Sequence, residues 1–334
     1  MSFHRALWYL ESRELMALGQ YLVTVYTDPT IAISRGVATF LKTRDIGALL
    51  KVIFAGGPTA GSVVDAWLVK NDLSVAEIDR RVQAYQANLK RLKAESDQRL
   101  AEFRNQRPLP PPTEPIRPLR GLDIRRAVMH LEEVEIRALC YRLLAYFDEK
   151  ETKHHQQIAK YVEAAAPNLE DLYQLANYAA IWIDGAYAQI VPTWLAANGL
   201  SAAEIDRRAQ AYQANLRLRA DESAQRWAEI RRQQAPQPQP SATSGSLFLD
   251  TLDVLPRLPE AEVQAMCYYV LSRHSDKESQ CHRALVRYVN ATPETRHNQK
   301  DTLRIGIAQV GDKSAEPTTI YTWLQEHGRL IQPR

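Results

Sequence analysis

Cysteine is scarce in this sequence, and the positions of the cysteines argue against a disulfide-stabilised fold and against a zinc site. The 334 residues contain three cysteines, Cys140, Cys267 and Cys281. So few thiols do not build a disulfide framework, and their separation does not match the ligand spacing of a zinc site. We therefore expect reduced, buried thiols, and neither a bound metal nor a cofactor.

Long apolar runs are also missing. No eighteen consecutive apolar residues occur, and residues 1–13 carry His4, Arg5, Glu11 and Arg13 without the apolar core of a signal peptide. These absences predict a cytoplasmic protein without a membrane partner.

Charge of one sign is only slightly in excess. The chain has 42 Lys and Arg against 39 Asp and Glu, a net charge of +3, and the two signs are interleaved. Nucleic-acid-binding domains usually concentrate basic residues on one face. We therefore expect a protein as the partner and keep nucleic acid as the less favoured alternative.

One stretch of the chain occurs twice. Residues 76–107 and 203–234 agree at 21 of 32 positions at an offset of 127 residues. The identity extends to positions that a helix exposes to solvent: Asp79, Arg80, Arg81 and Gln83. Either a recent duplication or a shared binding face explains it.

Each copy opens with a helix-start signal. Ser74 with Glu77, and Ser201 with Glu204, match a capping box. In this motif the serine hydroxyl accepts from the glutamate amide, and the glutamate side chain accepts from the serine amide. We therefore expect a long helix to begin directly after each serine.

Apolar residues then recur at alternating steps of four and three, without an interrupting glycine or proline. The pattern predicts two helices of about 32 residues, roughly 48 Å long, with a narrow coiled-coil seam. Ser96, Arg219 and Ser223 fall in these seams and are too polar for a strong isolated dimer. The helices can pair with each other or with another copy, and we expect packing within the protein.

Short amphipathic segments surround the long helices in a repeating order, and proline-rich stretches follow each long helix. The predicted fold is all-α: three small helical bundles in tandem, the first two each followed by a long coiled-coil-type helix. The predicted boundaries are bundle 1–72, long helix 73–107, linker 108–118, bundle 119–199, long helix 200–234, linker 235–247 and bundle 248–334. The chain reaches Arg334 where a third long helix is expected to begin.

Equivalent positions of the bundles are predicted to form a repeated core. Each recurring tryptophan precedes a helix end, which favours packing over an exposed anchor. Cys140 and Cys267 share one repeat position, and a small thiol packs well in a helical core. The predicted core residues are Trp67, Trp194, Trp323, Leu139, Cys140, Tyr161, Met266, Cys267 and Tyr288.

The bundles share a pattern at residues 135–143, 158–163 and 169–172, repeated at 262–268 with 285–289, and at 14–18 with 37–41. This pattern resembles a known family, the effector-associated domains of bacterial conflict systems, which are small death-like helical modules. The sequence departs from the family at 149–155, which lacks the usual acidic, glycine-containing loop, and in its long helices. The resemblance implies homotypic, non-enzymatic adaptor contacts that bring an effector to a sensor.

The densest group of potential metal ligands is His154 and His155 with Asp148 and Glu151. One helix face supplies only two ligands at the required spacing, so the others must come from elsewhere. We expect a solvated polar turn here and no metal site.

Two further motifs do not indicate catalysis. The side chains of Cys281 and His282 point to different faces of a helix, which disfavours a nucleophile and base pair. The glycines at 56–61 lack the lysine of a phosphate-binding loop. We therefore expect no catalytic residue and a non-enzymatic protein.

The function that fits best is a multivalent protein–protein adaptor or scaffold, linking a sensor to an effector in bacterial defence. We expect another protein, effector or sensor, as partner, and the long helices offer a route to self-association. The alternative is a nucleic-acid-associated helical protein that contacts phosphates through the arginines of the long helices. The candidate interaction surface is Arg80, Arg81, Gln83, Arg207, Arg208 and Gln210.

Overall fold

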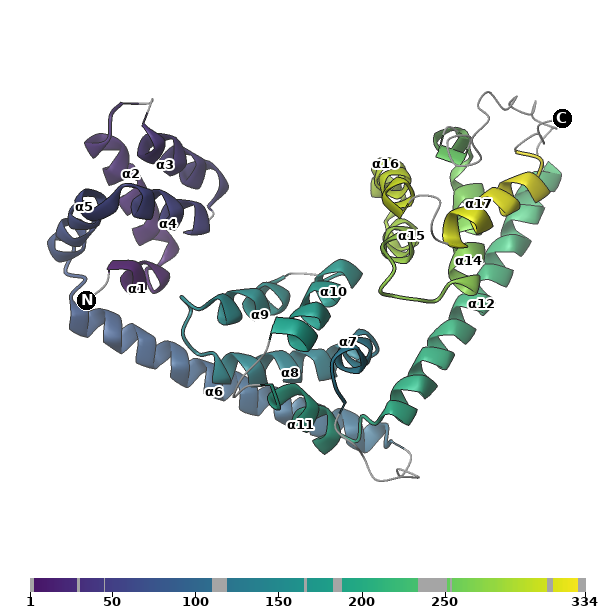
Figure 1. Ribbon diagram of the computed structural model, residues 1–334, viewed down its shortest axis with the longest axis horizontal. Helices are drawn as coiled ribbons and strands as arrows, with labels where there is room; N and C mark the ends of the chain where they lie inside the picture. Colours follow the sequence, from purple (N-terminus) through teal and green to yellow (C-terminus); the bar gives the residue numbers. More distant parts are fainter. Residues whose placement is uncertain are drawn as a thin grey trace. The chain divides into compact units, whose positions relative to one another are not determined.

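Every regular element in the described part of the chain is a helix, so the predicted all-α class is confirmed (Figure 1). The computed structural model describes residues 3–28, 31–44, 46–109, 119–164, 167–182, 188–233, 251–252, 254–310 and 315–329. The predicted linkers, 108–118 and 235–247, lie almost entirely outside these residues.

The chain forms two compact units. Unit 1 comprises Met1–Pro108 and Glu133–Glu163, and unit 2 comprises Leu109–Glu132 and Ala164–Arg334. The division runs through the second predicted bundle, 119–199. The predicted boundaries describe sequence repeats and stay a prediction, whereas the units reflect how the helices pack.

Unit 1 contains the first long helix and two groups of short helices. Its helices are α1 (Phe3–Trp8), α2 (Ser12–Val25), α3 (Ala32–Thr43), α4 (Ile46–Ala55), α5 (Gly57–Lys70), α6 (Val75–Gln106), α8 (Glu133–Tyr146) and α9 (Lys153–Glu163). Apolar residues of α1 to α5 and the start of α6 share one core, which includes Leu18, Phe40, Trp67 and Ile78. Farther along, α6 packs against α8.

Unit 2 repeats the pairing of a long helix with the helix of a later bundle. Its helices are α7 (Leu122–Met129), α10 (Leu169–Asn177), the π-helical η1 (Tyr178–Trp182), α11 (Ile190–Ala197), α12 (Ala202–Gln233), the 3-10 helix η3 (Leu255–Arg257), α14 (Glu260–Arg273), α15 (Gln280–Asn290), α16 (Pro293–Val310) and α17 (Ala315–Glu326). α12 packs against α14 as α6 packs against α8 (Figure 1).

Both long helices have the predicted length of 32 residues. Ser74 Oγ accepts from the Glu77 amide, and Ser201 Oγ accepts from the Glu204 amide, each at 3.2 Å. The reciprocal half of the predicted capping box is wrong for α6, because the Glu77 carboxylate accepts hydrogen bonds from Arg80 and Arg81. Serine capping alone therefore satisfies one of the free amides at this helix start.

The seam of α12 differs from its prediction at one position. Ser96 is buried in α6, as a seam residue is, but Arg219 is exposed in α12 and Ala220 is buried in its place. A guanidinium without a partner is costly to bury, so the apolar neighbour takes the inward position. At this position, the buried face of α12 is displaced by one residue from the predicted seam.

The predicted core residues are all buried. The three tryptophans are 3–5% exposed, and Leu139, Cys140, Met266, Cys267 and Tyr288 are fully inaccessible. Burial raises the pKa of the Cys140 and Cys267 thiols. Thiols in this state are inert packing groups.

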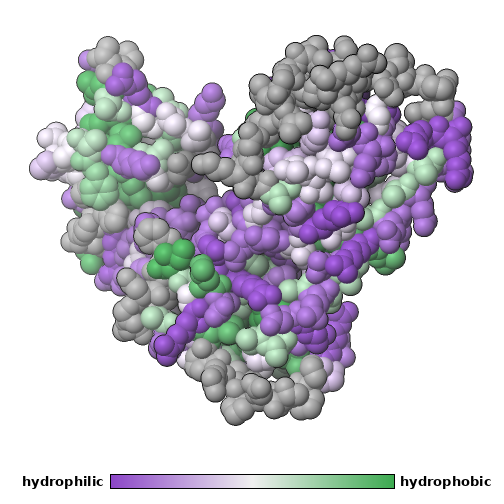
Figure 2. Space-filling model, turned by 45° about the vertical axis from the view of Figure 1, so that its right-hand side comes forward, coloured by the Kyte–Doolittle hydropathy of each residue, from purple (hydrophilic) through white to green (hydrophobic). Residues whose placement is uncertain are grey.

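Surface composition agrees with this division between core and exterior. On the face that Figure 2 shows, hydrophilic residues cover much of the surface, and hydrophobic residues form small separate groups. Among the described helices, none has the length and the apolar composition that crossing a membrane requires.

Candidate functional site

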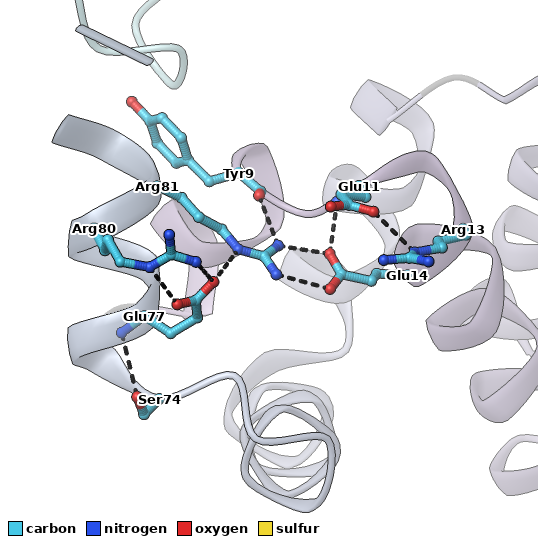
Figure 3. Close-up of polar contacts among 8 residues, drawn as sticks. All are labelled: Tyr9, Glu11, Arg13, Glu14, Ser74, Glu77, Arg80 and Arg81. Atoms are coloured by element: carbon cyan, nitrogen blue, oxygen red, sulfur yellow. Dashed lines mark hydrogen bonds and ion pairs between the residues drawn. The ribbon is translucent and has the colours of Figure 1, made fainter. Parts of the chain in front are cut away.

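The first polar cluster of interest joins the start of α6 to the helices before it (Figure 3). The Arg81 guanidinium donates to both carboxylate oxygens of Glu14, at 2.7 and 2.9 Å, and to Glu77 at 2.7 Å. It also donates to the Tyr9 carbonyl at 3.3 Å. Arg80 pairs with the same Glu77 carboxylate at 2.8 Å.

The start of α12 has the same arrangement. Arg207 and Arg208 both donate to the Glu204 carboxylate, at 2.7 and 2.6 Å. Arg208 also donates to the His130 carbonyl at 3.2 Å, as Arg81 does to the Tyr9 carbonyl. The two networks hold each long helix to the residues that precede α2 and α8, respectively.

The predicted interaction surface therefore divides into two kinds of residue. Arg81 and Arg208 are partly buried, and their donors are used inside the protein. Arg80 and Arg207 are more than half exposed but are bound to a glutamate one turn away. Gln83 and Gln210 are exposed. The six residues thus do not form one continuous free surface.

One turn farther along each long helix, a half-buried tyrosine contacts a buried histidine. Tyr85 on α6 contacts His155 on α9, with 2.7 Å between the hydroxyl and Nε2. His155 Nδ1 lies 2.5 Å from the Phe147 carbonyl oxygen. A carbonyl only accepts, so Nδ1 carries the proton, Nε2 is the acceptor, and the tyrosine hydroxyl donates.

The same pair recurs in unit 2. Tyr212 on α12 lies 3.0 Å from Nε2 of His282 on α15, and His282 Nδ1 lies 2.8 Å from the His274 carbonyl oxygen. Each of these residues stands 127 positions after its counterpart in unit 1. The geometry selects the same neutral histidine tautomer.

A lysine covers each tyrosine ring. Lys150 Nζ lies 4.1 Å from the Tyr85 ring centroid, and Lys277 Nζ lies 4.1 Å from that of Tyr212. An ammonium over an aromatic face is attracted by the ring quadrupole. Its positive charge also opposes protonation of the neighbouring histidine.

Burial sets the protonation states of these groups. It lowers the pKa of His282 to about 4, and it lowers that of His155 below its ordinary value. The lysine ammonium lowers both further. Burial raises the pKa of Tyr212 to about 12, and lowers that of Lys277 to about 8. At neutral pH the pair is uncharged and the lysine is charged.

One position differs between the two clusters. Tyr9 lies edge-on to Tyr85, with ring centroids 6.1 Å apart, and His130 lies edge-on to Tyr212 at the same separation. Burial, followed by the charges of Lys277, Arg126 and Arg208, lowers the pKa of His130 to about 3. We call these clusters junction 1 (Tyr9, Tyr85, Lys150, His155) and junction 2 (His130, Tyr212, Lys277, His282).

The prediction of a solvated polar turn at 148–155 is wrong for His155, which is 3% exposed. His154, its neighbour, stacks on the Phe147 ring with centroids 4.7 Å apart, so the two imidazoles serve different contacts. Among the described residues, no three His, Cys, Asp or Glu side chains gather closely enough to hold a metal ion.

Sequence reasoning did not identify the junctions. Tyr85 and Tyr212 fit the apolar seam, and His155 and His282 were assigned to unrelated motifs. The signal was present in the offset of 127 residues, which aligns Tyr85 with Tyr212, Lys150 with Lys277, and His155 with His282. Three polar residues with one spacing indicate a shared contact.

The chain was compared with protein-family models, with curated proteins and with solved structures, and no match was found in any of the three.

Proposed function

We propose that the protein is a non-enzymatic, cytoplasmic adaptor or scaffold whose repeated helical modules bind other proteins. The observation that carries this proposal is the repetition of junction 1 as junction 2, with the same tyrosine–histidine hydrogen bond and the same lysine over the tyrosine ring. Repeated joints give a chain several similar modules in a defined order. Tethered modules gain avidity through their effective concentration.

The chemistry of the junctions supports a mechanical role for them. Each histidine is neutral, with both ring nitrogens in hydrogen bonds to protein groups. Each tyrosine keeps its proton because burial raises its pKa. Groups that are buried, neutral and fully bonded hold helices together and offer no free base or nucleophile to a substrate.

The family resemblance adds a more specific form of the proposal. Effector-associated domains imply an adaptor that links a sensor to an effector in bacterial defence. The residues that carry the resemblance at 135–143 and 262–268 lie on α8 and α14, the helices against which the long helices pack. Homotypic binding would therefore use the faces of the bundles that point away from α6 and α12.

Nucleic-acid binding through the paired arginines is the weaker reading. Arg81 and Arg208 donate to carboxylates and to backbone carbonyls inside the protein, and Arg80 and Arg207 share those carboxylates. A phosphate would have to displace a bidentate ion pair to reach them. These contacts favour a structural role for the arginine pairs.

The test is capture followed by reconstitution. Full-length protein, cross-linked in its native cells, should recover the same protein partner repeatedly. That partner, purified, should bind the full chain saturably at physiological salt in isothermal titration calorimetry. Recovery of nucleic acid alone, with affinity falling steeply as salt rises, would refute the proposal. Failure to recover a protein partner would refute it as well.

A matched variant tests the predicted surface separately. Arg80→Glu with Arg207→Glu reverses the two exposed arginines and leaves Arg81 and Arg208 in place. If this surface binds the partner, the variant should raise the Kd at least tenfold. An unchanged Kd would place the binding site elsewhere on the chain.

A further inference from the structure

A groove in unit 2 runs along α12, between α14 and the end of α17. Its volume is about 660 Å³. On α12 it reaches from Gln213 to Arg231, which is roughly 27 Å of helix. The groove is therefore long and narrow, with the dimensions of a peptide segment and not of a compact small molecule.

Positive charge lines this groove. Arg217 and Arg231 come from α12, and Arg273 comes from α14, whereas Asp221 is the one carboxylate in the lining. None of the three arginines has an ion-pair partner in the described part of the chain. The Arg273 guanidinium lies 4.5 Å from the Tyr269 ring centroid. Unlike Arg81 and Arg208, these side chains are available to an acidic ligand.

The floor of the groove combines small residues with an unsatisfied donor. Ala220, Ala224 and Ala228 lie one turn apart on α12 and allow close approach. Trp227 also lines the groove and is 3% exposed. Its indole N–H has no hydrogen-bond partner within the described residues. A buried donor without an acceptor is uncommon in a folded protein.

Five of the eleven positions at which the two repeated stretches differ line this groove. Where α12 has Ala220 and Ala224, α6 has Lys93 and Asp97, which form an ion pair at 2.6 Å. Where α12 has Trp227, α6 has Leu100. The second copy therefore replaces a charged pair with small residues and adds a donor, although 21 of 32 positions are the same.

We propose that this groove binds an acidic, amphipathic helical segment of a partner protein. The inference rests on the adaptor function and names the chemistry of the partner. The partner's small apolar side chains lie over the alanines, and its carboxylates reach Arg217, Arg231 and Arg273. Arg217 and Arg231 are separated by fourteen residues, roughly 21 Å, so one small anion cannot reach both.

Base stacking, which single-stranded nucleic acids use, is not offered by this groove. Trp227 is buried, Trp323 is covered by His327 at 4.0 Å between centroids, and the Tyr269 ring is covered by Arg273. The chain's own residues 234–250 do not match the proposed ligand, because they contain one acidic residue and three prolines.

Site-specific cross-linking tests the proposal in the full-length chain. A photoreactive benzoylphenylalanine replaces Gln213 at the edge of the groove, and Gln86, its counterpart on α6, serves as the control position. After irradiation in native cells, the cross-linked segment is identified by mass spectrometry. We expect the Gln213 probe, and not the Gln86 probe, to capture a segment with carboxylates on one helical face.

The captured segment is then synthesised and titrated against purified full-length protein. A220K/A224D copies the ion pair of α6 into the groove and is compatible with a helix, so the fold should be retained by circular dichroism. This variant should raise the Kd at least tenfold, as should a peptide whose carboxylates are changed to amides. The reciprocal variant, K93A/D97A, should leave the Kd unchanged.

Three results would overturn the proposal: no cross-link from Gln213 above the Gln86 control, a cross-link to nucleic acid, to a second copy or to a segment without acidic residues, or an unchanged Kd in A220K/A224D. If the Kd is unchanged but a partner still binds the full chain, the groove is refuted as the binding site and the adaptor function still stands. If no protein partner is recovered at all, both the adaptor function and the groove as a binding site are refuted.

Discussion

Junction 1 and junction 2 are the same joint built twice, with one substitution. Both hold a tyrosine of the long helix against a neutral histidine and under a lysine. The fourth member is Tyr9 in junction 1 and His130 in junction 2. Junction 2 therefore contains a buried and a half-buried histidine where junction 1 contains one buried histidine. A contact that keeps its shape can still differ in its response to pH.

Contacts with neighbouring helices explain why positions of the repeated stretch that a lone helix would expose to solvent are identical. Asp79 pairs with Arg5, and Asp206, its counterpart, pairs with Arg126. Arg81 and Arg208 donate to backbone carbonyls in equivalent places. Residues that a lone helix would expose are engaged by neighbouring helices. The tyrosine and the paired arginines of the joint are identical in the two long helices, whereas Ala220, Ala224 and Trp227 of the groove differ from their counterparts.

Of the three comparisons, lowering the pH should produce the largest difference in stability between the two units. The junction histidines are neutral when folded, with His282 and His130 at pKa values of about 4 and 3, but take up a proton near pH 6.5 when unfolded. Their stabilisation is complete above pH 6.5 and is lost as the pH falls toward 4. Each histidine contributes a slope of about 1.4 kcal/mol per pH unit. Between pH 6.5 and 5.5, unit 2, which holds two such histidines, should lose more stability than unit 1, which holds one.

Amide hydrogen exchange, corrected for intrinsic rates, measures this difference through peptides from α6 and α9 and from α12 and α15. The pKa of Lys277, about 8, lies outside this window. His130→Tyr should reduce the slope of unit 2 to that of unit 1. Parallel loss in both units, or a slope unchanged by His130→Tyr, would contradict the assignment.

Removing the tyrosine hydroxyls should have the next largest effect. Tyr85→Phe keeps the ring under Lys150 but leaves His155 Nε2 without a donor. An unsatisfied buried acceptor costs about 1–3 kcal/mol. Tyr212→Phe should cost the same or slightly less, because its hydrogen bond is longer, 3.0 Å against 2.7 Å. Urea unfolding and hydrogen exchange measure both losses.

The chain supplies matched controls for this pair of variants. The hydroxyls of Tyr26 in unit 1 and Tyr288 in unit 2 are buried without a hydrogen-bond partner in the described residues. Tyr26→Phe and Tyr288→Phe should therefore be neutral or slightly stabilising. If the controls lose as much stability as Tyr85→Phe and Tyr212→Phe, the tyrosine–histidine hydrogen bonds contribute nothing specific.

The smallest change in stability should come from substitutions in the turn that connects each bundle to its long helix. Gly199 is in the left-handed conformation with φ 70°, and Asp72 is in the same region in unit 1 with φ 59°. Glycine adopts this conformation without strain. Asp72→Gly should stabilise unit 1 by about 0.5–1 kcal/mol. Gly199→Asp should destabilise unit 2, where a Cβ would meet Leu109 at 3.1 Å. Thermal unfolding checks the opposite signs.

Local patterns in the sequence predicted much of the fold. The serine caps, the uninterrupted runs and the proline stops determine where α6 and α12 begin and end, because these signals act between residues a few positions apart. The recurring tryptophans and Cys140 and Cys267 were predicted in the core for a similar reason. Their apolar neighbours recur with the helical period.

The polar contacts could not be predicted in the same way. Arg81 looked like a surface residue because its local neighbours are acidic and charged, yet its main partner is Glu14, 67 residues earlier. Tyr85 and His155 are 70 residues apart, and Tyr212 and His282 are also 70 apart. No local pattern reports such distances along the chain.

The sequence by itself determined the all-α class, the two long helices and the repetition, since these depend on propensity, capping and hydrophobic period over short spans. Only the tertiary structure decided which arginines are engaged, how the tyrosine–histidine joints form, and where the second long helix opens into a groove. Those features depend on which helices meet. That choice is made by the packing of the whole core and not by any one segment.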